Sequence, residues 1–181
     1  VARKNPEAVI KAFEYAFPKS YQNSVSLVIK STNGDRHPKE HKTLKNLIDR
    51  DPRIIHIQKV LPHYENAALI HCCDCYVSLH RSEGFGLTIA EAMLLGKPVI
   101  TTGYSGNMDF TTIETSLLVD YELIPVQQGD YPYSKDEMWA EPDIEQAGDY
   151  MKKLVSDKDF SCSFAKKGQE LIRTSFSIKS L

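Results

Sequence analysis

Apolar and polar residues alternate along the chain in short blocks, and these blocks predict strands and helices in alternation. Five runs are apolar and β-prone, as buried strands are, and they occupy residues 25–30, 54–57, 76–79, 99–101 and 116–119. Segments with helical spacing or composition occupy residues 40–49, 65–72, 87–95, 143–155 and 159–174. The alternation predicts an α/β fold, a Rossmann-like parallel sheet with helices on both faces.

Three further segments carry local predictions. A helix is expected near the N-terminus, with Asn5 as its cap and Pro6 in its first turn. A short turn is expected around residues 107–110. Residues 121–142 follow no regular period, so we expect an irregular surface excursion there, packed under three aromatic side chains. These are Tyr131, Tyr133 and Trp139.

The most informative segment joins the third predicted strand to the helix that follows it. Glu83 lies beside two glycines in the connecting loop, and Glu91 lies eight positions later on the helix, which Gly96 ends. The loop therefore lies at the carboxyl end of a parallel strand, where open α/β sheets bind their ligands.

The spacing in this segment fits a nucleotide-sugar. Glycines at 84 and 86 let the backbone approach a ligand, and the free amides at the helix start form an anion site. Glu91 follows about 5–6 Å along the helix axis, where a carboxylate can accept both hydroxyls of a ribose. Glu83 would face the other side of the phosphate, toward a transferred sugar. The three spaced glycines typical of dinucleotide sites are missing.

With these residues the chain resembles a known family. Residues 82–87, 91–93 and 96–100 resemble the signature of retaining glycosyltransferases of the GT-B fold, in the large group 1 (family four) class. The likeness continues through residues 101–109 and 139–143. It implies that the whole chain, residues 1–181, is one C-terminal, donor-binding domain. We therefore expect a fragment of a longer protein, with the N-terminal acceptor domain absent.

The resemblance also implies roles for individual residues. Glu83 would be the catalytic carboxylate beside the anomeric centre, and Glu91 would hold the ribose diol. Lys4 would neutralise the diphosphate, and its usual arginine companion would lie upstream of Val1, with Arg3 as the available substitute. Backbone contacts to the sugar and the diphosphate would come from Gly84, Phe85, Gly86, Leu87 and Thr88.

Arg81 directly precedes this motif, and the residue type leaves two interpretations open. A guanidinium pairs equally well with a carboxylate such as Glu83 or with a phosphate of the donor. It is therefore a further candidate for donor binding.

The expected reaction is retaining transfer of a hexose-type sugar from a nucleotide diphosphate to a glycan, lipid or polysaccharide precursor. The acceptor would be bound through the absent domain, so the isolated fragment is expected to be inactive. The scheme needs no metal and no cofactor, and the identity of the base is not readable. Two alternatives remain: a non-catalytic binding module of the same fold, and another enzyme on this architecture such as a nucleotide-sugar epimerase.

Composition agrees with one ordinary domain. The chain has 181 residues, 41% of them hydrophobic, and a net charge of −2, so nothing supports a nucleic-acid partner. No apolar run is long enough for a membrane span, although the full-length enzyme could associate peripherally with a membrane. Cys72, Cys73 and Cys75 suggest a metal site, but they lack a second ligand pair and are better interpreted as free thiols. Reduced thiols suit a cytoplasmic location.

Overall fold

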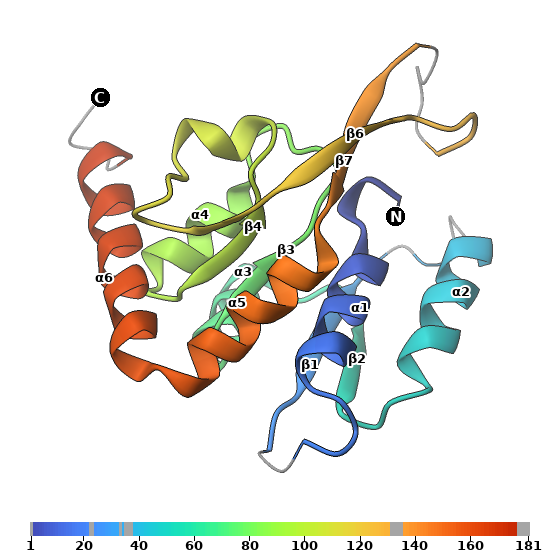
Figure 1. The fold of residues 1–181 in the computed structure, drawn as a ribbon, viewed down its shortest axis with the longest axis horizontal. Helices are drawn as coiled ribbons and strands as arrows, with labels where there is room; N and C mark the ends of the chain where they lie inside the picture. The colour runs from blue at the N-terminus through green and yellow to red at the C-terminus, as the bar shows by residue number, and fades with distance from the viewer. Residues whose placement is uncertain (1, 22–23, 33, 35–37, 131–135, 177–181) are drawn as a thin grey trace.

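The computed structural model describes residues 2–21, 24–32, 34, 38–130 and 136–176 (Figure 1). The parallel strands are β1 (Leu27–Ser31), β2 (Ile54–Gln58), β3 (Tyr76–Ser78), β4 (Val99–Thr102) and β5 (Leu117–Val119). The helices are α1 (Pro6–Ala16), α2 (Pro38–Ile48), α3 (His63–Cys72), α4 (Leu87–Leu94), α5 (Ile144–Ser156) and α6 (Lys158–Ser175), with 3-10 turns η1 (Ala2–Lys4) and η3 (Gly106–Asp109). Every strand and helix predicted with a residue range is confirmed, with ends that differ by at most two residues.

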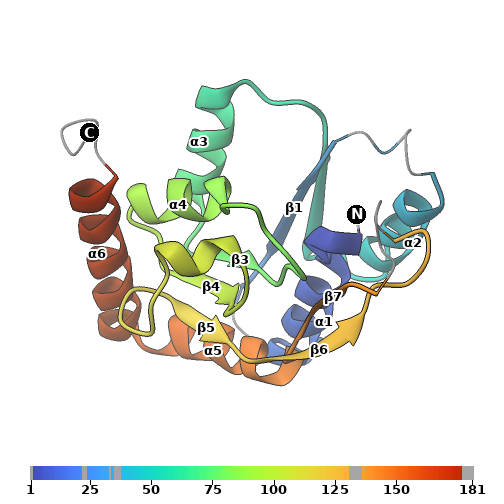
Figure 2. The ribbon, with the colours of Figure 1, turned by 90° about the horizontal axis from the view of Figure 1, so that it is seen from above.

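Helices cover both faces of the parallel strands (Figure 2). Helices α1 and α5 pack together on one face, while α3 and α4 lie on the other. Strand β4 shows why both faces must be covered, because all four of its residues are buried. Successive side chains of a strand point to opposite faces: Val99 packs in the core around α4, and Ile100 packs in the core around α1 and α5. The predicted α/β class is thus confirmed.

The parallel strands form two hydrogen-bonded groups instead of one continuous ladder. Strand β1 pairs with β2, and β3, β4 and β5 pair in that order. Helix α1 contacts both β1 and β3, so the two groups share one core although their strands are not bonded to each other. The carboxyl ends of β3 and β4 lie side by side in the three-stranded group, and their loops form the candidate site.

The expectation of an irregular excursion over residues 121–142 is wrong. Strands β6 (Tyr121–Pro125) and β7 (Met138–Pro142) form an antiparallel pair that projects from the domain (Figure 1). Cross-strand pairing produces this order, because Leu123 opposes Ala140 and Ile124 opposes Trp139. Trp139 is buried as expected, whereas Tyr131 and Tyr133 lie outside the described residues.

The start of α1 departs from the prediction in one respect. Pro6 begins the helix as expected, but the Asn5 side chain makes no capping hydrogen bond. Asn5 has the left-handed φ of 50°, and its side chain is turned inward and buried. Its carbonyl oxygen accepts the Ala8 amide at 3.1 Å, so the backbone closes this turn. None of the helices in the described ranges is both long and apolar enough to cross a membrane.

Candidate functional site

The loop after β3 and the start of α4 bring the predicted motif to one edge of the sheet. Gly86 precedes α4 with a left-handed φ of 88°, where any larger residue would be strained and its Cβ would lie 3.1 Å from the Ile89 Cδ1 atom. Gly84, in contrast, has no atom within 4 Å of the position that a Cβ would take. The first glycine of the motif thus faces open space, and the second makes the turn into the helix.

Two cations from the N-terminal turn η1 neutralise the Glu83 carboxylate. The Lys4 ammonium donates to one carboxylate oxygen, and Arg3 Nη1 lies 3.2 Å from the other. Arg3 Nη1 also donates to the Ser82 carbonyl oxygen at 2.7 Å. Only 6% of the Glu83 side chain is exposed, whereas the Arg3 and Lys4 side chains are 30% and 52% exposed, so a buried carboxylate meets two partly solvated cations. Lys4 therefore lies beside the predicted catalytic carboxylate, and Arg3 joins it there.

These contacts set the protonation state of Glu83. Burial raises the pKa of the Glu83 carboxyl, but the hydrogen bond from Lys4 and the charges of Lys4 and Arg3 outweigh burial. The net result is a pKa below the ordinary glutamate value. Glu83 is thus ionised at neutral pH. A carboxyl group has to be ionised to stabilise positive charge that develops beside it.

A second loop, between β4 and η3, holds the backbone of Glu83 in place. The Glu83 amide donates to the Ser105 hydroxyl at 2.7 Å, and the Gly106 amide donates to the Glu83 carbonyl oxygen at 3.1 Å. Ser105 has no capping bond to η3, so its hydroxyl serves the neighbouring loop instead. No feature of the sequence pattern indicated this contact.

A buried polar network lies behind the two loops. His80 is fully buried, with its Nδ1 atom 3.0 Å from the Ser78 hydroxyl and its Nε2 atom 3.0 Å from Asn107 Oδ1 and 3.1 Å from the Tyr104 carbonyl oxygen. Because a carbonyl oxygen only accepts, Nε2 carries the proton and Nδ1 accepts from Ser78. Asn107 in turn donates to the Thr102 carbonyl oxygen at 3.0 Å. The sequence signal for this hub was a histidine directly after a buried strand.

The network predicts a pH dependence of stability. Burial lowers the pKa of His80, so the unfolded chain takes up this proton more readily than the folded one. The free energy of unfolding should therefore decrease as pH falls below about 6.5, by at most about 1.4 kcal/mol per pH unit. Urea unfolding between pH 8 and pH 5 should show a shallower dependence for His80→Gln than for the parent.

His56 provides the comparison, because burial also lowers its pKa. A double variant, His56→Gln with His80→Gln, should flatten the dependence further than either single variant. An unchanged slope in His80→Gln would show that the histidine does not titrate with folding.

Glu91 lies on α4 with 30% of its side chain exposed, facing the start of α3. Its Oε1 atom lies 3.6 Å from His63 Nε2, and the His63 side chain is 87% exposed. Both side chains are therefore open to a ligand along this edge. The two carboxylates of the motif have different surroundings, because Glu83 is enclosed by cations and Glu91 is accessible.

The remaining motif residues divide between packing and exposure. Leu87 is exposed at the first position of α4, and the Phe85 ring, although 40% exposed, packs one side against Phe110 with ring centroids 4.9 Å apart. The Thr88 hydroxyl accepts from the Tyr76 hydroxyl at 2.9 Å. Thr88 can therefore offer its backbone amide to an anion while its side chain is held by β3.

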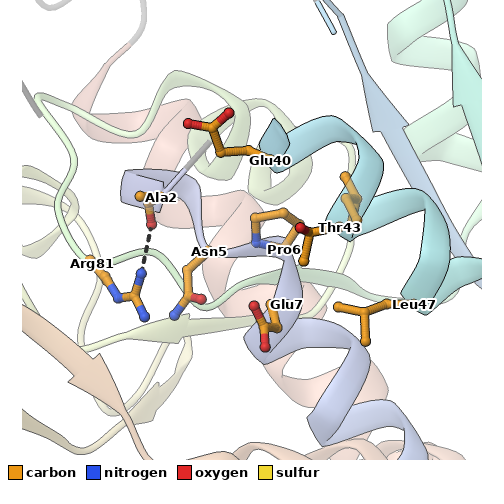
Figure 3. Close-up of a pocket in the computed structure, with 9 residues that line it drawn as sticks. Ala2, Asn5, Pro6, Glu7, Glu40, Thr43, Leu47 and Arg81 are labelled. Carbon is orange, nitrogen blue, oxygen red and sulfur yellow. Dashed lines mark hydrogen bonds between the residues drawn. The ribbon is translucent and has the colours of Figure 1, made fainter. Parts of the chain in front are cut away.

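Arg81 does not pair with Glu83, which was one of its two expected partners. Its Nε atom donates to Glu141 Oε2 at 2.7 Å, and its Nη1 atom donates to the Ala2 carbonyl oxygen at 3.2 Å (Figure 3). The guanidinium also lies 5.1 Å from the centroid of the Trp139 ring. Arg81 thus connects the motif loop to the N-terminal turn and to β7.

A pocket of about 180 Å³ lies beside Arg81, between the start of α1 and α2. Figure 3 shows residues that line it. Its lining mixes apolar side chains with polar and charged ones, and it contains no residue of the motif that Arg81 precedes. The pocket is adjacent to the charge cluster without containing Glu83 or Glu91. The candidate site is instead the open edge formed by the loops after β3 and β4.

The cysteines behave as isolated thiols. Cys72, Cys73 and Cys75 are all free, and burial raises the pKa of Cys75 to about 12. Within the described ranges, no three histidine, cysteine or acidic side chains are grouped to hold a metal ion.

The sequence profile described as "Glycosyl transferases group 1" matches residues 1–119, more than half of the chain. The chain belongs to this family. A search of the curated proteins found no match to this glycosyltransferase sequence.

Solved structures agree with the family in fold. HepE from Anabaena, in complex with UDP-glucose, is 18% identical with a TM-score of 0.75, over 99% of this chain and 43% of that one. The C-terminal domain of the group 1 glycosyltransferase LpcC from Francisella tularensis is 23% identical with a TM-score of 0.70, over 97% of this chain and 81% of that one. Sucrose-phosphate synthase from Thermosynechococcus elongatus is 21% identical with a TM-score of 0.72, over 98% of this chain and 39% of that one. The domain therefore has the GT-B type of fold and spans less than half of HepE and of the synthase.

Proposed function

We propose that this glycosyltransferase domain binds a nucleotide-diphosphate sugar, and that the full-length enzyme transfers a hexose-type sugar from it with retention of configuration. The observation that carries the proposal is the pair of carboxylates on one loop and helix. Glu83 lies between Arg3 and Lys4 in the loop that leads into α4, and the accessible Glu91 lies on α4 itself. The HepE complex with UDP-glucose shows that a protein of this fold binds such a donor.

Helix α4 and Lys4 would hold the diphosphate. The Ile89 and Ala90 amides donate to the Gly86 carbonyl oxygen, so the Leu87 and Thr88 amides are the ones left for the diphosphate, at the positive end of the helix dipole. As the sugar leaves, negative charge builds up on the diphosphate, and preorganised donors stabilise that charge. Glu91 would accept the ribose hydroxyls, and the backbone from Gly84 to Thr88 would contact the sugar and the phosphates.

Glu83 would orient the sugar and stabilise the oxocarbenium-like centre. Donor binding would draw Lys4 from Glu83 toward the phosphate, while Arg3 stays on the carboxylate through its bond to Ser82. The carboxylate would then face the anomeric carbon with one counter-charge fewer. The acceptor, which we take to be a glycan, lipid or polysaccharide precursor, would be bound by a second domain of the full-length enzyme. That enzyme would act in the cytoplasm or at the cytoplasmic face of a membrane.

Nucleotide titration of this chain tests the proposal most directly. Calorimetry with UDP, GDP and ADP should show saturable binding of one of them. Glu91→Ala should weaken that binding at least about tenfold, because it removes hydrogen bonds to a charged acceptor worth about 1.5–3 kcal/mol each. The fold should not change, since the Glu91 side chain is partly exposed.

His63→Ala is the matched control, because it removes the neighbour of Glu91 and leaves the carboxylate in place. It should weaken binding less than Glu91→Ala does. If Glu91→Ala binds the nucleotide as well as the parent, the ribose assignment is wrong. If neither this chain nor the full-length protein binds any of the three nucleotides, a non-catalytic module is the better description.

A further inference from the structure

Arg81 is bound to two distant chain segments by both its backbone and its side chain. Its amide donates to the Arg3 carbonyl oxygen at 2.8 Å, and its Nη1 atom donates to the Ala2 carbonyl oxygen at 3.2 Å. On the other side, its carbonyl oxygen accepts the Ala140 amide at 3.0 Å, and its Nε atom donates to Glu141 at 2.7 Å. Arg81 thus joins turn η1 to strand β7.

The guanidinium is well suited to this position. Only 22% of the Arg81 side chain is exposed, and it stacks at 5.1 Å over the buried Trp139 ring. Its rigid fork donates to Glu141 and to the Ala2 carbonyl oxygen at the same time, in directions that a lysine ammonium on a flexible stem does not fix. The contact with Glu141 therefore orients the whole group.

Turn η1 is the segment that carries both cations of the Glu83 cluster. It is only three residues long, and Arg81 bonds two of its three carbonyl oxygens. The position of Lys4 therefore depends on Arg81 through the backbone of the turn. Glu141, on β7 opposite Glu122, is the charged partner of Arg81.

We propose that Arg81 and Glu141 form a positioning pair that fixes turn η1, and with it Lys4 and Arg3, against Glu83. Neither residue is a catalytic group, because each acts through the turn. The structural part of the proposal concerns this chain alone, whereas its effect on donor binding rests on the proposed function. The pair also connects hairpin β6–β7 to the site, so a ligand or domain that displaces the hairpin would change the cation arrangement.

The titration of Glu83 tests the structural part without a substrate. Carbon-13 NMR of the Glu83 side-chain carboxyl should give a midpoint that moves to higher pH in Arg81→Gln and in Glu141→Gln, because burial remains while the cations become less well held. Asp149→Asn, which breaks an exposed ion pair with Lys152 on α5, should leave the midpoint unchanged. Glu141→Gln keeps shape and volume at a partly exposed position, so it should fold even where Arg81→Gln does not.

A double variant shows whether the two residues act as one unit. If they do, Arg81→Gln with Glu141→Gln should move the midpoint no further than Arg81→Gln alone. Nucleotide affinity should fall about tenfold in the single variants, as for the loss of a charged hydrogen bond. An unchanged Glu83 midpoint in folded Arg81→Gln overturns the positioning pair. If the midpoint shifts in the variants but neither the parent chain nor the full-length protein binds a nucleotide, the positioning pair stands and the proposed function is wrong.

Discussion

Glu83→Gln in the full-length enzyme is expected to lower the rate of sugar transfer by roughly 100-fold, the usual effect of removing one preorganised electrostatic group. Glutamine keeps the size of the side chain, but its single amide oxygen replaces the two carboxylate oxygens that accept from Arg3 and from Lys4. It removes the negative charge that would stabilise the oxocarbenium-like centre. The loss should therefore appear in kcat, measured with saturating donor.

The same substitution, Glu83→Gln, should not weaken nucleotide binding and could strengthen it. In the structure Lys4 is bound to Glu83, so the diphosphate has to compete with this carboxylate for the ammonium. Glu83→Gln removes that competition, and UDP or its analogue should bind as well as before or more tightly. Glu170→Gln, at an exposed position on α6, makes the same change in charge as a control. Transfer within about threefold of the parent, with affinity unchanged, would leave Glu83 only a structural role.

Local pattern was enough to predict the strands, the helices and the class of fold. Strand β4 illustrates the reason, because a run of four buried residues between turn signals has few other stable conformations in a chain of this kind. Hairpin β6–β7 was not predicted because its order comes from pairing across the turn. Leu123 and Ala140 are partners only once the two strands meet.

In the candidate site, too, contacts between residues close in sequence were predictable and contacts between distant residues were not. The glycines, Glu83 and Glu91 are close in sequence, so their spacing predicted a loop and a helix start with the correct geometry. The charges that set the state of Glu83 come from residues 79 and 80 positions away, and the partner of Arg81 is 60 positions away. No local pattern indicates such pairs. For this reason the sequence left open which anion Arg81 would meet.

Gly106→Ala is expected to reduce both stability and nucleotide binding. A Cβ at residue 106 would lie 1.9 Å from the Gly84 carbonyl oxygen and 3.0 Å from the Phe85 amide nitrogen. These are backbone atoms, which cannot rotate away as the end of a flexible side chain can. Relief requires the two loops to separate, at a cost of about 1–3 kcal/mol in the free energy of unfolding.

Separation of the loops would also break the bond from the Gly106 amide to the Glu83 carbonyl oxygen, so the carboxylate would lose its fixed position. Urea unfolding and calorimetric titration of the same sample therefore measure both effects. Gly84→Ala is the matched control, because its Cβ would meet no atom within 4 Å. It should unfold like the parent and yet weaken nucleotide-sugar binding if the backbone at Gly84 contacts the sugar. Equal stability of the two variants would mean that the loops adapt, and that the contact between them does not position Glu83.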